Sequence, residues 1–188
     1  MTSEFADPAV VEELGLTLVP EFITPEEEQL LLPLLVVGKS EAVNERVASN
    51  YTGRSSVQRY GSSVPYPNYI VSPTIPPHFG AILSRLVEQN YVIHRPDSVT
   101  INEYLPGAEI YAHIDASAAG GVITVLSLAA PAVMVLELKK KNIRHAVLLP
   151  PRSLVQLRGP SRYVWTHEIL PVEATRYSLV FRCSRDSH

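Results

Sequence analysis

The sequence predicts an α+β protein dominated by β structure, and a jelly roll fits the pattern of its elements. Two helical segments stand in the N-terminal half, and eight short apolar or alternating segments follow from residue 98 onward. Helices that precede a run of strands are typical of helices packed on a β structure. No internal repeat or low-complexity tract interrupts the 188 residues. We therefore expect one domain over residues 1–188, with a core at about 14–183.

The chain begins with an expected strand over 16–23 and an expected helix over 24–35. Thr24 suits the N-cap, Pro25 suits the first turn, and Glu27 completes a capping box. The acidic residues in this first turn also favour the positive end of a helix.

A second helix is expected over 77–90, where apolar residues recur at helical spacing. The Pro- and Tyr-rich stretch before it, 63–77, predicts an exposed loop. After the second helix, short segments separated by turn residues indicate antiparallel strands. These expected strands cover 98–104, 109–115, 121–128, 132–138, 145–150, 153–158, 162–169 and 176–182.

The composition predicts a soluble protein of the cell interior. Hydrophobic residues make up 46% and charged residues 19% of the chain, which fits a packed globular protein and not a disordered one. The single cysteine, Cys183, excludes an internal disulfide framework. An acidic N-terminus and a most apolar stretch of 15 residues, broken by Pro131, predict neither a signal peptide nor a membrane span. We expect a cytoplasmic location, with the nucleus as an alternative.

Charge is unevenly distributed along the chain. The formal net charge is −3, but residues 1–45 hold ten acidic residues and one basic residue, whereas residues 46–188 hold nine and fifteen. The net charge argues against non-specific nucleic-acid binding by the whole molecule, while the basic part could accept a phosphate backbone locally. An ordinary scatter of surface charge explains the same numbers.

The segment INEYLPGAEIYAHIDAS, at 101–117, holds the first candidate metal ligands. His113 and Asp115 are two residues apart, so in a strand they share a face and could bind one metal ion together. His167, on a later expected strand, is the best candidate for a third ligand. Two histidines and one carboxylate on one side of a metal are typical of non-haem Fe(II) oxygenases. The H-x-D pair alone is a weak signal, because a buried histidine is commonly just hydrogen-bonded.

The last expected strand, RYSLVFR, adds a candidate site for carboxylates. Alternation places Arg176, Ser178 and Arg182 on one face of this strand. Two guanidinium groups leaning inward would leave roughly 6–8 Å between them, about the size of a five-carbon dicarboxylic acid. Asn102 and Tyr104 also share a strand face and could supply an amide and a hydroxyl. The alternative is that these arginines form ion pairs at the protein surface. This alternative is disfavoured because the other residues on their face of the strand are expected to point inward.

Seven of these candidates resemble, in type, order and spacing, the motif of the AlkB family of Fe(II)/2-oxoglutarate dioxygenases: Asn102, Tyr104, His113, Asp115, His167, Arg176 and Arg182. The resemblance runs from about Leu14 to Arg182. Within the family it is greatest to the branch that hydroxylates modified wobble uridine in tRNA. The passages RPDSVTINEYLPGAEIYAHID, VLLPPRSLVQLRGPSRYVWTHEI and RYSLVFR carry this likeness.

The resemblance implies a double-stranded β-helix with helices packed on it. By the same likeness, Fe(II) is held by His113, Asp115 and His167, and the distal carboxylate of 2-oxoglutarate is bound by Arg176 with help from Asn102 and Tyr104. Arg182 is expected toward the metal end, near Asp115, and Ser178 stands at a position where the tRNA branch also has serine. The implied reaction uses molecular oxygen and 2-oxoglutarate, releases succinate and carbon dioxide, and hydroxylates a C–H bond of the substrate. A methyl group on nitrogen would then leave as formaldehyde, whereas a methylene group would keep the hydroxyl.

Substrate binding is expected in the segment before the first motif strand, at 50–69. The candidates are Arg54, Arg59, Tyr60 and Tyr66, because arginines among tyrosines suit phosphates and stacked bases. An ordinary strand edge with half-buried tyrosines is the alternative. The basic segment 139–144 could likewise touch a nucleic-acid backbone or simply be solvated.

Three functions follow from these observations. The first is hydroxylation of a modified wobble uridine in tRNA, and the second is oxidative demethylation of N-methylated RNA, DNA or protein lysine. The third is a non-catalytic binding protein on a dioxygenase scaffold, which the complete set of metal candidates and arginines disfavours. We expect RNA as the partner of a monomeric protein, with a further chain as a candidate source of RNA binding, because these residues show no RNA-recognition module.

Overall fold

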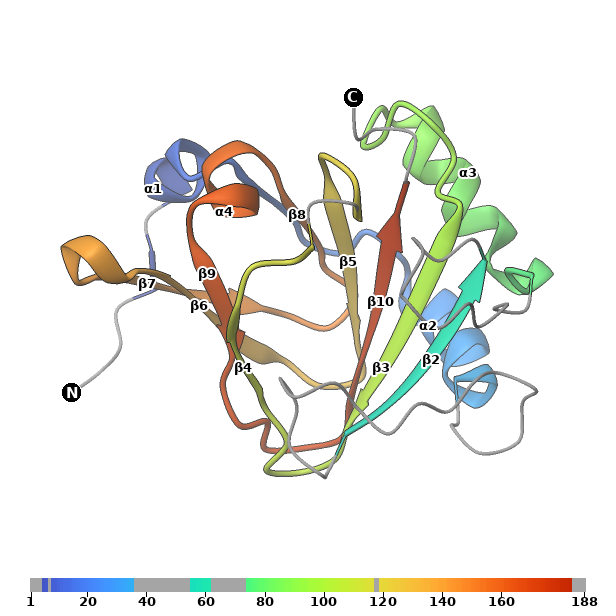
Figure 1. The fold of residues 1–188 in the computed structure, drawn as a ribbon. Helices are drawn as coiled ribbons and strands as arrows, with labels where there is room; N and C mark the ends of the chain where they lie inside the picture. Colours follow the sequence, from blue (N-terminus) through green and yellow to red (C-terminus); the bar gives the residue numbers. More distant parts are fainter. Residues whose placement is uncertain (1–4, 7, 36–54, 62–73, 117–118, 184–188) are drawn as a thin grey trace.

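The computed structural model describes residues 5–6, 8–35, 55–61, 74–116 and 119–183. Within these ranges, two antiparallel sheets face each other and helices flank the larger sheet (Figure 1). The larger sheet has the order β1 (Leu16–Val19), β8 (Leu154–Leu157), β5 (Ile123–Leu128), β10 (Arg176–Arg182), β3 (Ser98–Tyr104) and β2 (Ser55–Gly61). The smaller sheet has the order β4 (Ile110–His113), β9 (Thr166–Ile169), β6 (Ala132–Leu138) and β7 (Ile143–Leu149). The predicted jelly roll is confirmed.

The larger sheet is buried on both faces. On its outer face lie α2 (Pro25–Leu31) and α3 (Gly80–Glu88), which pack with strand residues in one apolar cluster (Figure 1). Its inner face and the smaller sheet form a second cluster, which includes Leu136, Val155 and Val180. The strand β8 shows this burial on both sides, because all four of its residues are buried. The functional pocket lies between the two sheets.

Local sequence signals explain how α2 begins and ends. The Thr24 hydroxyl accepts a hydrogen bond from the Glu27 N–H at 3.2 Å, and the Glu27 carboxylate accepts one from the Thr24 N–H at 2.9 Å. The predicted capping box is therefore confirmed. The α-helix stops at Leu31 and continues as a 3₁₀ turn, η1 (Leu32–Leu34), because Pro33 has no N–H to donate and its ring excludes a regular helix. The helix expected over 24–35 is accordingly shorter.

Several short elements differ from the sequence-based expectation. The strand β2 was expected only as the alternative for the segment 50–69, and its polar sequence becomes a strand by pairing with β3 along its whole length. Two short helices, α1 (Pro8–Glu13) and α4 (Gly159–Tyr163), were also missed. Because α4 occupies the start of the strand expected over 162–169, β9 begins only at Thr166. Of the loop expected over 63–77, residues 63–73 lie outside the described residues, and Pro77 opens a second 3₁₀ turn, η2 (Pro77–Phe79).

None of the helices in the described ranges is long and apolar enough to cross a membrane.

Candidate active site

A pocket of about 70 Å³ lies between the two sheets. Its walls are apolar residues of β5, β6, β8 and β9, and polar residues occupy one side. All of the predicted metal and cosubstrate residues line this pocket: Asn102, Tyr104, His113, Asp115, His167, Arg176, Ser178 and Arg182. The fold therefore brings together residues from four segments of the chain: β3, β4 with the residues that follow it, β9 and β10.

Three side chains that line the pocket form a constellation that could hold a metal ion. His113 on β4 and His167 on β9 are cross-strand partners, and their ring centroids lie 4.4 Å apart. Oδ2 of Asp115 lies 3.9 Å from Nε2 of His167. The three potential ligand atoms all lie within 4.8 Å of one another, so one ion can contact all of them. Two imidazoles and a carboxylate on one side leave the other positions open, as oxygen-activating Fe(II) sites require.

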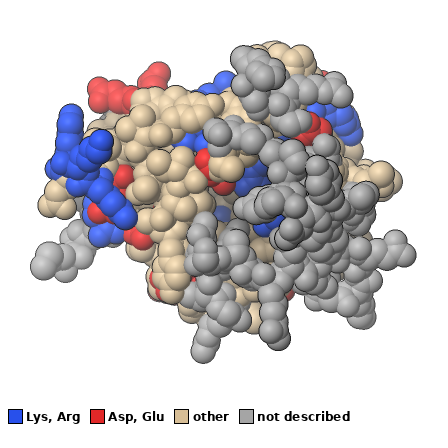
Figure 2. Space-filling model, viewed as in Figure 1, with Lys and Arg blue, Asp and Glu red and all other residues tan. Residues whose placement is uncertain are grey.

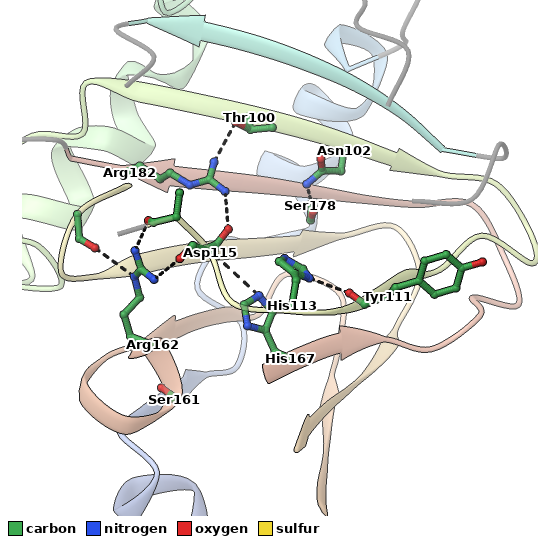
Figure 3. Close-up of polar contacts among 12 residues, drawn as sticks. Thr100, Asn102, Tyr111, His113, Asp115, Ser161, Arg162, His167, Ser178 and Arg182 are labelled. Carbon is green, nitrogen blue, oxygen red and sulfur yellow. Dashed lines mark hydrogen bonds and ion pairs between the residues drawn. The ribbon is translucent and has the colours of Figure 1, made fainter. Parts of the chain in front are cut away.

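The orientation of His113 leaves one ring nitrogen for a metal. Its Nδ1 lies 2.8 Å from the carbonyl oxygen of Tyr111 (Figure 3). A carbonyl oxygen only accepts, so Nδ1 carries the proton and Nε2 carries the lone pair. The backbone of β4 thus fixes both the tautomer and the direction of this ligand.

Burial and charge set the other two ligands in their metal-binding forms. Burial, followed by the neighbouring His113, lowers the pKa of His167 to about 4, so its ring is neutral at pH 7. Burial alone would raise the pKa of the Asp115 carboxyl, but the charges of Arg182 and the two histidines hold this pKa below its usual value. A neutral imidazole and an ionised carboxylate are the species that bind a metal.

The position of Asp115 differs from the sequence-based expectation. The strand ends at His113, so alternation along a strand does not place the carboxylate. Instead, Nη2 of Arg182 holds Oδ1 of Asp115 at 3.3 Å, and Nη1 of the same arginine donates to the Thr100 hydroxyl at 3.0 Å. Both of these contacts hold the guanidinium of Arg182 near the metal-binding residues. The idea that it shares one dicarboxylate with Arg176 is corrected, and its placement beside Asp115 agrees with the resemblance.

Arg176 lines the same pocket and offers a group that could bind an anion. Its guanidinium is 1% exposed, lies 4.9 Å from the ring centroid of Tyr104, and donates from Nη2 to the Ser127 hydroxyl at 2.9 Å. In the part of the chain that the structure describes, its Nε and Nη1 are buried without a hydrogen-bond partner. A buried cation with two unpaired donors is costly, and a carboxylate that accepts hydrogen bonds from this guanidinium would offset the cost. These orphaned donors therefore fit the distal carboxylate of 2-oxoglutarate.

A polar wall runs from Arg176 toward the metal ligands. Nδ2 of Asn102 donates to the Ser178 hydroxyl at 3.0 Å, and the Tyr104 hydroxyl lies 3.4 Å from the same oxygen. Sequence reasoning missed Ser127, which is fully buried on β5. A lone serine in the apolar run ITVLSL was the available signal.

The predicted substrate residues fall into three groups. Arg59 is the cross-strand partner of Thr100, so it lies on the pocket side of β2. Tyr60 points to the opposite face, where it is buried against Phe79 and donates to Gln58 at 3.2 Å. This placement fits the alternative of a strand with buried tyrosines. The other two candidates, Arg54 and Tyr66, lie outside the described residues.

With this geometry in view, comparison with known proteins decides the family. The sequence matches the 2OG-Fe(II) oxygenase superfamily over residues 15–185. The chain belongs to this superfamily. It is a dioxygenase that depends on Fe(II), 2-oxoglutarate and molecular oxygen.

Similar sequences confirm the resemblance to the AlkB family. The chain is 34% identical over 164 residues to the mouse tRNA (carboxymethyluridine(34)-5-O)-methyltransferase ALKBH8, a match that covers 84% of this chain and 24% of that protein. It is 32% identical to the Alkylated DNA repair protein ALKBH8 homolog of Arabidopsis thaliana, over 82% of this chain and 50% of that protein. The chain thus spans about a quarter of the animal proteins that it matches.

Solved structures show the same fold at low identity. OsALKBH1 superposes with a TM-score of 0.67 at 14% identity, over 96% of this chain and 100% of that one. A prolyl-4-hydroxylase of Pseudomonas putida superposes with a TM-score of 0.63 at 17% identity, over 93% of this chain and 97% of that one.

Proposed function

We propose that this dioxygenase acts on RNA and hydroxylates a 5-substituted wobble uridine of tRNA. The observation that carries the proposal is the complete site, in which a His-Asp-His constellation and a buried arginine with orphaned donors lie in one pocket. When bound, Fe(II) and 2-oxoglutarate supply the oxidising chemistry. The chain itself binds the cosubstrate, orients the ligands, and surrounds the reaction with apolar walls that exclude water.

The substrate class is supported by the relatives and by surface charge. The name of the mouse relative refers to carboxymethyluridine at position 34 of tRNA. In this chain, three consecutive lysines form η4 (Lys139–Lys141), the turn between β6 and β7. Figure 2 shows a cluster of basic side chains at this edge of the molecule. Such a cluster suits phosphate groups, which supply most of the affinity in nucleic-acid binding.

The basic turn is close enough to the pocket for one RNA strand to reach both. Leu136 on β6 is the cross-strand partner of His167, and the turn begins three residues later at Lys139. Three residues of strand span roughly 10 Å, so Lys139 lies about that far along the sheet from the position that pairs with His167. A nucleotide placed at the pocket would therefore have neighbouring phosphates near the turn.

Oxidative demethylation is the second candidate. The name of the Arabidopsis relative refers to alkylated DNA repair, and the same constellation would oxidise a methyl group on nitrogen. The two reactions differ in the substrate carbon that the pocket presents and not in the metal ligands.

Nucleoside mass spectrometry distinguishes the two reactions. Total tRNA is incubated with the protein, Fe(II), 2-oxoglutarate and ascorbate, with the Asp115→Ala variant as the control. Gain of one oxygen on a 5-substituted uridine, only with 2-oxoglutarate and the wild-type protein, supports hydroxylation. Loss of a methyl group from another nucleoside supports demethylation. An unchanged nucleoside profile would reject tRNA as the substrate and direct the search to DNA or protein lysine.

A further inference from the structure

We infer that Arg162 is a positioning residue that holds the metal ligand Asp115 in place through the backbone. Neither the motif nor the substrate candidates include this arginine. It lies in α4 and is 1% exposed, although it carries a full positive charge. The inference rests on the metal site of the proposed function and adds a residue to it.

Arg162 binds the segment that carries Asp115 with three donors. Its Nη1 donates to the carbonyl of Asp115 itself at 2.9 Å, its Nη2 to that of Ala116 at 2.6 Å, and its Nε to that of Gly120 at 3.1 Å (Figure 3). The guanidinium has five N–H groups in a rigid plane, so it can join three carbonyls in one fixed arrangement. One side chain thus determines the path of the backbone on both sides of residues 117–118.

The segment needs such support because the sheet does not hold it. The pairing of β4 with β9 ends at His113, and Asp115 lies beyond the last ladder position. A fixed backbone at Asp115 is a precondition for the contact between its carboxylate and Arg182. Arg162 and Arg182 therefore act on different parts of the same ligand, the first on its main chain and the second on its carboxylate.

A second neighbour confines the backbone at Gly120. Gly120 has a φ of +93°, and a Cβ at this position would lie 2.4 Å from the carbonyl oxygen of Cys183. The backbone of Gly120 thus passes directly against the end of β10, where no larger residue fits. Held between Cys183 and the guanidinium of Arg162, the backbone at Gly120 has little freedom to shift.

Arg162 also connects two of the three metal ligands. It precedes His167 by five residues and lies in the helix that leads into β9. Its hydrogen bonds run from this helix to the segment that follows β4. The side chain of Arg162 therefore helps to fix the distance between Asp115 and His167. The cross-strand pairing of His113 with His167 fixes the other two ligands relative to each other. Outer contacts that orient ligands typically change metal affinity by about 10–100-fold.

Metal binding measured without substrate tests the inference. The probe is Mn²⁺, titrated calorimetrically into the full chain at a temperature well below the melting point. We expect Arg162→Met, which keeps the length of the side chain and removes its donors, to weaken Mn²⁺ binding by about tenfold or more. Arg162→Lys retains the charge, but its ammonium group cannot reach three carbonyls in one fixed plane. Its affinity for Mn²⁺ should therefore lie between those of the wild type and Arg162→Met.

Arg158→Met is the matched control. Arg158 stands at the start of the same helix and donates to the backbone carbonyl of Tyr91 and to Gln156, away from the metal ligands. Its loss removes comparable hydrogen bonds and lowers the melting temperature, but the affinity for Mn²⁺ should stay within twofold of the wild type. Near-wild-type Mn²⁺ affinity in folded Arg162→Met protein would overturn the inference and leave the arginine with a purely structural role.

The outcomes separate this inference from the proposed function. Absence of Mn²⁺ binding by the wild-type protein would overturn the metal site and the positioning role together. Weakened Mn²⁺ binding by Arg162→Met, combined with an unchanged tRNA nucleoside profile, would support the positioning role and reject only the assigned substrate.

Discussion

Nη2 of Arg176 donates a hydrogen bond of 2.9 Å to the hydroxyl of Ser127, across the paired strands β10 and β5. This bond holds one edge of the guanidinium and leaves Nε and Nη1 for a ligand. The guanidinium is therefore held in place without a ligand, which would reduce the ordering that binding of a carboxylate requires.

Removal of the Arg176 charge should weaken 2-oxoglutarate binding strongly. A charge-assisted, bidentate carboxylate contact contributes about 2–3 kcal/mol, so we expect Arg176→Gln to raise the dissociation constant roughly 30–150-fold. Ser127→Ala keeps the charge and should raise it only a few-fold. Calorimetry of 2-oxoglutarate with the Mn²⁺-loaded protein measures both constants. Equal effects of the two substitutions would mean that the charge is not the binding group.

Loss of either the aspartate or the first histidine should abolish metal binding. Asp115→Ala leaves two imidazoles, and His113→Ala leaves one imidazole and one carboxylate, neither of which holds a divalent ion firmly. We expect no Fe(II)-dependent succinate production from either variant. Full succinate production by Asp115→Ala protein would contradict the metal assignment.

The lysine turn should control the salt dependence of RNA binding. Replacing Lys139, Lys140 and Lys141 with alanine removes up to three phosphate contacts, so the slope of log K against log salt should become less steep by about 1–2 units. Arg95→Ala, which removes an exposed cation beyond α3, is the control and should leave the slope unchanged. Filter binding of tRNA at several salt concentrations provides the slope. If the lysine variant and the wild type have the same slope, RNA does not contact the lysine turn.

The two neighbouring candidates on β2 should behave differently. Arg59 lies on the pocket side of the strand, so Arg59→Ala should raise the KM for tRNA several-fold and leave the KM for 2-oxoglutarate unchanged. Tyr60→Phe removes only the hydroxyl that donates to Gln58 inside the core, so it should leave both constants unchanged. Steady-state kinetics with each substrate varied in turn measures these constants. A larger effect from Tyr60→Phe than from Arg59→Ala would reverse the assignment of faces.

Glu27 should stabilise the fold in a pH-dependent way. Its hydrogen bonds from Arg85 and from the Thr24 N–H lower its pKa below the ordinary value of 4.5. A carboxyl whose pKa is lower in the folded state stabilises the fold above its unfolded pKa, and the contribution is lost as the pH falls through the folded pKa. We expect Glu27→Gln to cost about 1 kcal/mol at pH 7 and much less at pH 3. Urea unfolding at both pH values tests this, and an equal cost at both would contradict it.

Much of the fold and of the site follows from local patterns. The capping box of α2, the alternation in β3 and β10, and the types and spacing of the pocket residues depend on near neighbours in the chain. Strand alternation is a property of the backbone, so it placed Asn102 with Tyr104, and Arg176 with Ser178, on common faces without further information. These patterns were enough to predict the β-rich fold and the residues of the pocket.

Other features arise only from contacts between distant segments. The strand β2 exists because β3 offers it a partner, and the face of Tyr60 depends on that register. The position of Asp115 depends on Arg162 and Arg182, which are 47 and 67 residues away. A local pattern carries no information about such contacts, because the hydrogen bonds that replace a sheet ladder here come from side chains distant in sequence. The residues of the metal site can thus be recognised in the sequence, whereas the support that holds its carboxylate is visible only in the folded protein.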